Sequence, residues 1–404
     1  MSYTADLHLH SRYAYATSKN ITLERLAAWA RVKGIDLLSS ADFTHPVWRR
    51  ELEDKLVPVS PGLYRFGGVS FVLGTEVSCV YKQGGRSRRV HMLLFAPGFA
   101  TVDRLRAAFS DAGAKLESDG RPTLRMSARD LTALALDIDP QCMVIPAHVW
   151  TPWFGLFGSK SGFDHLEECF LDMAPQIHAI ETGLSSDPAM NWNIQGLGDR
   201  SIVSFSDAHS APKLGRELTV FDGDLGYGEL ADALRHRRVA YSVEFYPEEG
   251  KYHHSGHRKC GVSHSPEDTA RIGQRCPVCN RPLTLGVLHR ISGLSDGEES
   301  SHRDAGGFVQ NQEGFPPFIR LVPLIEVIAE TMGLGPASKR VEREYSRIIG
   351  ELESELNVLA WAGEADLVTV AGETLARNIL KARVGEVMVE PGYDGLYGKV
   401  SVAG

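Results

Sequence analysis

Short apolar runs alternate with segments of helical period along the first 246 residues, and this alternation constrains the fold more than any other feature. The runs are "DLHLHS", "IDLLSSADF", "VSFVLGTEVSCVY", "RRVHMLLFA", "CMVIPAHVW", "IHAIETGL", "SIVSFSDAH" and "VAYSVEFY". Helices are expected between several of them, over 22–34, 101–113, 127–138 and 226–238, the first with Thr22 as N-cap and Gly34 past its end. Strands that alternate with helices predict an α/β fold with a mainly parallel sheet or barrel.

The pattern changes after this first part, which predicts four units along the chain. We expect a barrel over 1–246, a small Cys/His-rich module over 247–295, a flexible loop over 296–317 and a mainly helical region over 318–404. The loop prediction comes from the low apolar content and the many Gly, Ser and acidic residues of that segment. The last residues are expected to form a β-hairpin with its turn near Asp394 and Gly395.

The composition is typical of a soluble globular protein, with 43% hydrophobic and 23% charged residues. We expect neither a membrane span nor a signal peptide, because no long apolar stretch and no basic region followed by an apolar run is present. Six cysteines in 404 residues do not make a disulfide scaffold, which favours a reducing, cytoplasmic setting. The net charge of −8 argues mildly against nucleic-acid binding, but residues 235–290 carry ten Lys and Arg against five Asp and Glu.

Histidines and carboxylates stand at or near the ends of the apolar runs. They are His8, His10, Asp42, His45, Glu76, His91, His148, Asp207 and His209. Functional side chains gather at the carboxyl ends of strands in parallel sheets and barrels, so these groups are expected at one mouth. The set exceeds the needs of one ion and predicts two or three divalent ions, Zn, Mn or Mg. Asp6 shares a strand face with His8 and His10, and we expect it to orient them.

The series "DLHLHS", "SADFTHP", "GTE", His91, "PAH" and "SDAH" resembles the polymerase and histidinol phosphatase (PHP) superfamily over roughly residues 1–245. The resemblance implies a distorted seven-stranded βα barrel whose two or three metal ions hydrolyse phosphoesters with an activated water. It implies one ion held by His8, His10, Glu76 and Asp207, a second held by Glu76, His91 and His148, and a third held by His209 with His45 or Asp42. Phe43 follows Asp42 where the superfamily usually has histidine, so the third site departs from the pattern.

A second cluster has the spacing of a zinc site. His257-x-x-Cys260 and Cys276-x-x-Cys279 form two ligand pairs, with fifteen residues between Cys260 and Cys276. We expect one structural Zn here, which would stabilise a module too small to build its own core. His253, His254 and His264 are alternative donors in place of His257.

Aromatic and basic residues near these clusters are candidates for DNA and lesion binding. Trp150, Trp153 and Phe154 follow His148 and could stack on an extruded base, although packing at the barrel mouth is an equally good interpretation. Arg258 and Lys259 belong to the basic segment and could contact phosphates.

The order of these parts, with "DFTHP", "AHVWTPWFG", "ETGLSSDP", "CPVCNRPLTLGVLHR", "LVPLIEVIAE" and "PGYDGLYGKVS", closely resembles the endonuclease Q family over the whole chain. The resemblance implies a DNA repair endonuclease that nicks 5′ to deaminated bases (hypoxanthine, uracil, xanthine) or abasic sites, with Asp207, Glu76 and His10 in catalytic positions. Its partner would be double- or single-stranded DNA with damaged bases, and whether a sliding clamp assists stays open. A PHP-type phosphatase or exonuclease, and a non-catalytic nucleic-acid binding protein, are the alternatives.

Overall fold

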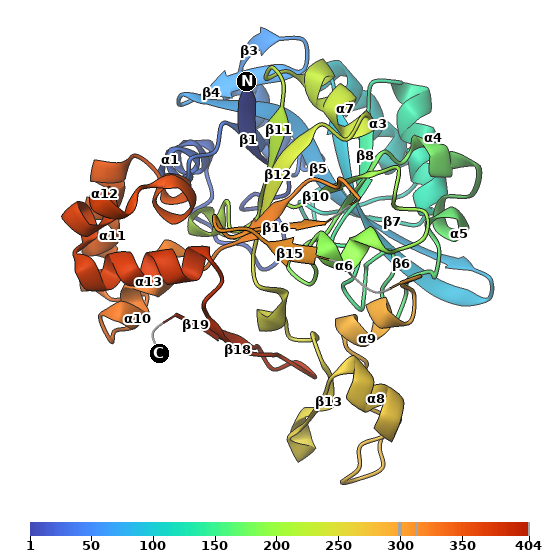
Figure 1. Cartoon of the computed structure of the whole chain (residues 1–404). Coiled ribbons are helices and arrows are strands. Elements are labelled where there is room, and N and C mark those ends of the chain that lie inside the picture. Colours follow the sequence, from blue (N-terminus) through green and yellow to red (C-terminus); the bar gives the residue numbers. More distant parts are fainter. Residues whose placement is uncertain (298–300, 312, 403–404) are drawn as a thin grey trace.

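A large mixed sheet forms the centre of the molecule, with helices around it, a helical C-terminal region on one side and a small module at one end (Figure 1). The computed structural model describes residues 1–297, 301–311 and 313–402. Within these residues, no helix is long and apolar enough to cross a membrane. The coarse prediction of an α/β fold followed by a helical region is confirmed.

The sheet places β1 (Ser2–Asp6) at its middle, parallel to β2 (Leu37–Ser39) on one side and antiparallel to β11 (Leu218–Asp222) on the other. The strands that continue from β2 are β5 (Val69–Gln83), β4 (Leu63–Phe66) and β3 (Val57–Ser60), with β6 (Arg86–Ala96), β7 (Thr123–Leu124) and β8 (Met143–Pro146) branching from β5. The strands that continue from β11 are β12 (Val239–Glu244), β17 (Phe318–Arg320), β16 (Phe308–Asn311) and β15 (Ser301–Arg303).

The expected mainly parallel arrangement is wrong, because β5 and β6 form one long antiparallel hairpin. Gly84 and Gly85 make its turn with φ of 58° and 74°, a conformation that glycine adopts without strain. The β6–β8 and β1–β11 pairs are antiparallel as well. The two apolar runs that form β5 and β6 were separated in the sequence analysis, and the Gly-Gly pair between them is the signal that identifies the hairpin.

Two further strands, β9 (Ala179–Glu181) and β10 (Ser201–Val203), pair in parallel with one another and not with the large sheet in the described residues. A backbone hydrogen bond from Val149 N to Glu181 O (3.0 Å) links the segment after β8 to β9. Ser204 N donates to Thr219 Oγ1 (2.9 Å) between the ends of β10 and β11. The strands therefore follow one another around a common centre without one continuous ladder, and the seven-stranded barrel stays a prediction.

The helices expected from periodicity are all present. They are α1 (Leu23–Lys33), α3 (Phe99–Asp111), α4 (Ala128–Ile138) and α7 (Tyr227–Arg235). Thr22 caps α1 by accepting from Arg25 N, and Gly34 ends it at φ 83°, as predicted. Helices that the sequence analysis did not predict are α2 (Pro46–Lys55), α5 (Leu166–Phe170), α6 (Ala189–Trp192) and the short turns at Leu171–Gln176, Ala211–Lys213 and Pro247–Glu249.

The C-terminal region packs against the sheet body through a shared apolar core. Its helices are α10 (Leu324–Thr331), α11 (Lys339–Leu352), the π-helix Asn357–Trp361, α12 (Glu364–Ala371) and α13 (Glu373–Arg383). Leu324, Ile348 and Ile379 lie in the same cluster as Leu26 and Phe71, and each such buried side chain contributes about 1.5–3 kcal/mol to stability. A buried ion pair between Lys33 and Glu355 also joins the two parts.

The last strands, β18 (Met388–Glu390) and β19 (Lys399–Ser401), are antiparallel, so the predicted hairpin is confirmed. Asp394 and Gly395 have φ of 43° and 87° between them. The predicted flexible loop is wrong over the residues that form β15 and β16, which extend the central sheet by pairing with each other and with β17. Residues 298–300 and 312 of that prediction lie outside the described residues.

Candidate metal centre

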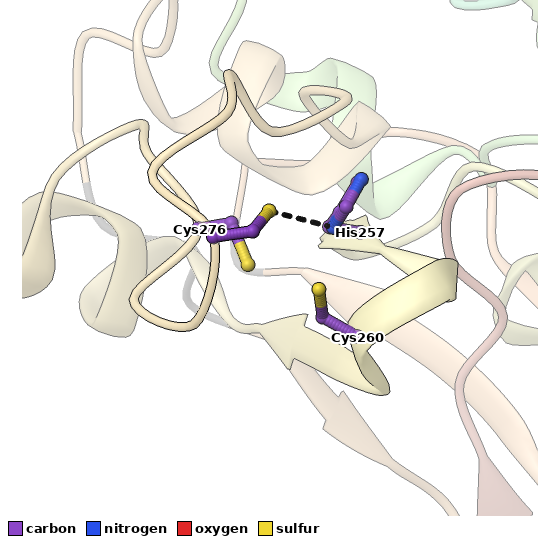
Figure 2. A group of neighbouring side chains, drawn as sticks. His257, Cys260 and Cys276 are labelled. Atoms are coloured by element: carbon purple, nitrogen blue, oxygen red, sulfur yellow. Dashed lines mark hydrogen bonds between the residues drawn. The ribbon is translucent and has the colours of Figure 1, made fainter.

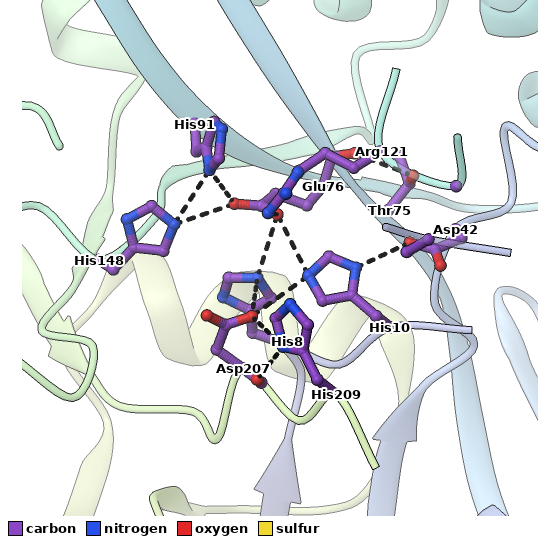
Figure 3. A network of polar contacts seen from close by, with 12 residues as sticks. His8, His10, Asp42, Thr75, Glu76, His91, Arg121, His148, Asp207 and His209 are labelled. Atoms are coloured by element: carbon purple, nitrogen blue, oxygen red, sulfur yellow. Dashed lines mark hydrogen bonds and ion pairs between the residues drawn. The ribbon is translucent and has the colours of Figure 1, made fainter. Parts of the chain in front are cut away.

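Glu76 stands at the centre of a buried cluster of imidazoles and carboxylates (Figure 3). Its Oε1 lies 2.7 Å from His91 Nδ1 and 3.0 Å from His148 Nε2. Its Oε2 lies 3.3 Å from His10 Nε2 and 3.6 Å from His8 Nε2. One carboxylate therefore joins two separate pairs of histidines, which is the arrangement of a bridging ligand.

Asp207 lies on the other side of His8 and His10. Its Oδ1 is 3.4 Å from His8 Nε2 and 3.2 Å from His10 Nε2, and 3.6 Å from His209 Nδ1. Three groups of residues each bring their donor atoms within 4.8 Å of one another. They are His8, His10 and Glu76; His10, Asp207 and His209; and Glu76, His91 and His148. The structure thus brings together seven of the nine residues singled out in the sequence.

The local fold explains how these side chains converge. Glu76 is opposite Leu93 in the β5–β6 ladder and His91 is opposite Ser78, so Glu76 and His91 share one face of the hairpin. The strand predicted over "DLHLHS" ends already at Asp6, and His8 and His10 follow it on either side of a bridge between Leu9 and Ala208. That bridge places the two histidines beside the segment that contains Asp207 and His209.

Several residues at the centre have strained backbones. Asp42, His148 and Asp207 have φ of 36°, 30° and 45°, a region that residues other than glycine rarely adopt. Such conformations cost about 1–3 kcal/mol each and persist only where the surroundings enforce them. The fold therefore holds these positions against their local preference, as expected of a functional site.

Behind the cluster, two carboxylates orient the histidines of the first run. Glu181 accepts from His8 Nδ1 (2.8 Å) and from the backbone N of His148 (2.7 Å). Asp42 lies 3.1 Å from His10 Nδ1. These contacts turn the Nε2 atoms of His8 and His10 toward Glu76 and Asp207.

The predicted orienting role of Asp6 is wrong. Its carboxylate accepts from the backbone N atoms of Ser206 (3.0 Å) and Gly215 (2.9 Å), and the carboxylates at Nδ1 of His8 and His10 are Glu181 and Asp42. Its pKa is raised to about 6 by burial, against the effect of these hydrogen bonds.

The structure does not bring Asp42 or His45 together with His209. Asp42 points at the far side of the His10 ring, and the ring of His45 stacks on Tyr13 at 4.1 Å. In the described residues His209 has His10 and Asp207 as its close donor neighbours instead. The departure "SADFTHP" in the second motif accompanies this difference.

The electrostatics of the cluster are dominated by burial and by opposite charges in contact. Burial alone would raise the pKa of Glu76, but His91, Arg121 and His8 hold it well below its usual range. Burial alone would lower the pKa of His8 and His10, but the surrounding carboxylates raise it well above the usual value. Burial lowers the pKa of His91 to about 4 despite Glu76, so this ring is neutral and its lone pair is available.

The donor set fits divalent metal ions. His8 Nε2, His10 Nε2 and Asp207 Oδ1 are buried and have no hydrogen-bond partner within the part of the chain that the structure describes. Buried polar atoms normally have a partner, so two imidazole nitrogens and a carboxylate oxygen that converge on one point without one fit a bound cation. Imidazole nitrogens combined with carboxylate oxygens are the donors of Zn²⁺ and Mn²⁺ sites.

Two residues of the centre, Glu181 and Arg121, were not among the residues predicted from the sequence. Glu181 ends the run "IHAIETGL" just as the other candidates end theirs, so the same rule would have found it. Arg121 lies on the loop before β7, and its NH1 is 3.0 Å from Glu76 Oε2. No pattern in the sequence distinguishes Arg121 from other loop arginines, and only the folded chain places it here.

The second predicted cluster also assembles. His257, Cys260, Cys276 and Cys279 bring their donor atoms within 4.8 Å of one another, and Figure 2 shows three of them directed at a common point. His257 Nδ1 lies 3.5 Å from Cys279 Sγ, which matches the edge of about 3.5 Å expected for a tetrahedral zinc with bonds of about 2.0 and 2.3 Å. Burial would raise the pKa of Cys276, but the backbone N–H groups of Cys279 and Val278 lower it to about 6.

The part of the chain around this cluster, the zinc-type module, is small. Its elements are β13 (Ser255–His257), the turn Arg258–Cys260, β14 (Val262–His264), α8 (Pro266–Ile272) and α9 (Val287–Ser292). Its own apolar cluster consists of Val262, Cys276 and Leu283. A core of this size cannot hold the module together, which is the situation in which a bound metal stabilises a fold. Of the alternative donors, His253 stacks on His254 and His254 lies near Ser263, so the geometry favours His257.

The predicted stacking residues have different environments. Trp150 is 1% exposed and donates from Nε1 to Asn191 Oδ1 (2.8 Å), so its assignment to base stacking is wrong and its role is in the core. Phe154 packs against His91 with ring centroids 4.4 Å apart. Trp153 is 41% exposed beside Tyr252 of the zinc-type module, which leaves it as the accessible aromatic ring of the three.

Comparisons with known proteins place the chain among relatives. Residues 323–386 match the family model described as the MJ0043 C-terminal domain. The uncharacterized protein MJ0043 of Methanocaldococcus jannaschii is 31% identical over 260 residues, which is 62% of this chain and 31% of that protein. This chain thus aligns with under a third of that relative. The uncharacterized protein YqxK of Bacillus subtilis is 28% identical over 414 residues, 98% of each chain.

Two solved structures superpose along the whole chain. The lesion-specific endonuclease PfuEndoQ from Pyrococcus furiosus superposes with a TM-score of 0.87 and 30% identity, covering 100% of this chain and 96% of that one. An endonuclease Q in complex with a 27-mer duplex that has an abasic lesion at the active site superposes with a TM-score of 0.86 and 30% identity, over 100% and 97% of the chains. At this identity over nearly the whole length of both chains, the protein belongs to the endonuclease Q family.

Proposed function

We propose that this protein is a metal-dependent DNA repair endonuclease. It cleaves the phosphodiester bond 5′ to a deaminated base (hypoxanthine, uracil or xanthine) or to an abasic site. The observation that carries the proposal is the cluster around Glu76 and Asp207, in a chain that superposes along its whole length on an endonuclease bound to a lesion duplex.

The donor groups suit two or three divalent ions, Zn, Mn or Mg. His8, His10, Glu76 and Asp207 would hold the first, Glu76 with His91 and His148 the second, and His209 with His10 and Asp207 the third. The chemistry that such ions supply is activation of water near neutral pH and neutralisation of phosphoryl oxygens. The third set differs from the one expected by resemblance, because Asp42 and His45 lie away from His209.

The protein's own residues prepare the site. Glu181 and Asp42 accept from Nδ1 of His8 and His10, so the Nε2 atoms of both rings face the centre, where a bound ion would replace the proton on Nε2. Arg121 places a guanidinium beside Glu76, with its side chain 21% exposed, where a phosphate oxygen of the DNA strand can reach it. A lesion also pairs weakly in the duplex, so its extrusion costs less than that of a normal base.

In this proposal the parts of the chain have separate tasks. Residues 1–246, with a PHP-type barrel, cleave the strand, and the structural Zn of residues 247–295 holds a module that lies beside the exposed Trp153. Arg258 and Lys259 of that module contact phosphates. The helical region over 318–404 supports the body through the core that it shares with α1 and β5.

End-labelled duplexes test the proposal directly. Four duplexes carry deoxyinosine, uracil, an abasic site or no lesion, and each is incubated with the protein and Mn²⁺ or Mg²⁺, with and without chelator. We expect a metal-dependent nick just 5′ of the lesion and none in the control duplex. Release of phosphate from a generic monoester without any nick would replace the proposal by a PHP-type phosphatase, and degradation from DNA ends would indicate an exonuclease.

A further inference from the structure

The β5–β6 hairpin extends away from the rest of the sheet, and its tip is basic. Residues 82–89 contain Lys82, Arg86, Arg88 and Arg89, and no Asp or Glu occurs between residues 77 and 102. Figure 1 shows this tip, in light blue, projecting from the body of the molecule. In a chain with a net charge of −8, four cations within eight residues form a pronounced local excess.

The ladder of the hairpin connects this tip to the metal centre. Ser78 is opposite His91, Val80 is opposite Arg89 and Lys82 is opposite Ser87. Residues two apart on a strand, and residues directly opposite in a ladder, point to the same side. Lys82 and Arg89 therefore lie on the face of the hairpin that carries Glu76 and His91 further along.

The distances suit a duplex that lies along this face. From Glu76 to Lys82 the strand advances six residues, or about 20 Å at about 3.3 Å per residue. That is the rise of about six base pairs of B-DNA, at about 3.4 Å per phosphate along one strand. A duplex whose cleaved bond lies at Glu76 can thus run beside the hairpin tip.

The tip cations differ in whether they are free to bind. Arg88 is engaged within the protein, since it donates to Gly162 O and its guanidinium lies 4.0 Å over the ring of Phe163. Lys82, Arg86 and Arg89 are exposed and form no salt bridge in the described part of the chain. The acid near Arg86, Asp164, pairs with Arg290 at 2.5 Å.

Arg89 also has a direct connection to the site. Its guanidinium lies 5.6 Å from the centroid of Phe154, and Phe154 packs against His91. The cation at position 89 is thus held beside the rim of the metal centre, with its charge facing outward.

We propose that Lys82 and Arg89 bind the phosphate backbone of duplex DNA beside the cleaved bond, whereas Arg86, opposite Gln83, lies on the other face of the hairpin. This inference rests on the proposed function and names a contact surface, the tip of the β5–β6 hairpin, that is separate from the zinc-type module. Lysine and arginine contacts to phosphates carry no base information, so the tip fixes where the duplex lies and not which lesion is cleaved.

The test measures how binding depends on salt. A labelled duplex with one abasic site is titrated with the protein in chelator, over a series of NaCl concentrations. For the double variant Lys82→Gln, Arg89→Gln, we expect the slope of log K against log salt to become less negative by about 0.9 for each lost phosphate contact. The same relation predicts binding about eightfold weaker per contact at about 0.1 M salt.

A matched control removes the same charge elsewhere. Lys339 and Arg343 lie exposed on α11 in the helical region, and their replacement by Gln should leave the salt slope unchanged. The single variant Lys82→Gln spares the contact between Arg89 and Phe154, so it keeps the test valid if the double variant folds poorly.

The outcomes separate this inference from the proposed function. If the wild-type protein nicks the lesion duplex but the hairpin variants keep the wild-type slope, the hairpin is not a DNA contact while the proposed function stands. An equal change of slope in the α11 control would show that the lower net charge alone causes the change, and it would overturn the inference. If the wild-type protein neither binds nor nicks the duplex, the proposed function fails first.

Discussion

Replacing Glu181 by glutamine tests whether the residues behind the metal centre prepare its histidines. Glu181 is fully buried and uses its two oxygens for two different donors, Nδ1 of His8 at 2.8 Å and the backbone N of His148 at 2.7 Å. Glutamine has the same shape but only one acceptor oxygen, and its amide group would face the second donor. The variant therefore breaks one hydrogen bond and leaves a buried N–H group unsatisfied.

Two magnitudes follow from this change. A buried donor without a partner costs about 1–3 kcal/mol, so the free energy of unfolding of the metal-free protein should fall by that amount. Loss of a partner that orients a metal-binding histidine typically weakens metal affinity by about 10–100-fold. Both effects should appear together, because His8 and His148 belong to different sets of donors that share Glu76.

The assay is single-turnover nicking of the abasic duplex as a function of free Mn²⁺, combined with denaturant unfolding in chelator. We expect the Mn²⁺ concentration for half-maximal nicking to rise about 10–100-fold in Glu181→Gln. Glu244→Gln is the matched control, because Glu244 is also fully buried but contacts Ser204 and not a histidine of the centre. An unchanged Mn²⁺ dependence in Glu181→Gln, or an equal shift in Glu244→Gln, would refute the reasoning.

Three further outcomes are expected. Asp207→Asn should abolish nicking while leaving the fold and DNA binding largely intact, as checked by circular dichroism and binding in chelator; loss of folding would contradict this role. Cys276→Ser should lower the zinc content by about one ion per chain and weaken the module or DNA binding, and an unchanged zinc content would disprove the zinc assignment. Burial raises the pKa of Glu244 from 4.5 to about 8, so the folded state holds this proton more tightly than the unfolded state. Stability should then fall between about pH 5 and 8 by at most about 1.4 kcal/mol per pH unit, and Glu244→Gln should flatten this slope in unfolding experiments at several pH values.

Local signals in the sequence were sufficient for the helices with a clear apolar period, namely α1, α3, α4 and α7. The hydroxyl of Thr22 and the left-handed Gly34 define α1 at both ends, and both act within a few residues of the helix they terminate. The hairpin turn at Asp394 and Gly395 could be predicted for the same reason. In each case the physical cause lies in neighbouring residues, so a single sequence contains it.

The direction and pairing of strands could be predicted less well, since they depend on distant residues. Glu76 and His91 were expected at the ends of separate strands, but they lie within one long hairpin. Their convergence comes from the register of β5 and β6, in which Ser78 faces His91, and from the position of β6 between β5 and β8. The prediction of a common site nevertheless succeeded, because it required only that these groups meet and not how.

The residues that orient the ligands were the hardest to predict. Asp6 was preferred because it is two residues from His8, whereas the actual partner, Glu181, is separated from His8 by 173 residues. The strand β1 ends at Asp6, so both histidines lie beyond the regular alternation on which the expectation for Asp6 depended. Orientation of a side chain is decided by tertiary contacts, so sequence proximity is a poor guide to it.

The arrangement of charge explains how a protein with a net charge of −8 can suit a DNA substrate. Several of its acids, among them Asp6, Glu181 and Glu244, are buried, and burial raises the pKa of Asp6 to about 6 and that of Glu244 to about 8. Two or three divalent ions would add about four to six positive charges at the centre, which the sequence total leaves out. The exposed Lys82 and Arg89 lie on the hairpin face that leads to this centre. The field that a phosphate backbone meets would then be set mainly by these two residues, Arg121 and the bound ions, and the sum over the whole sequence is a weak guide to it.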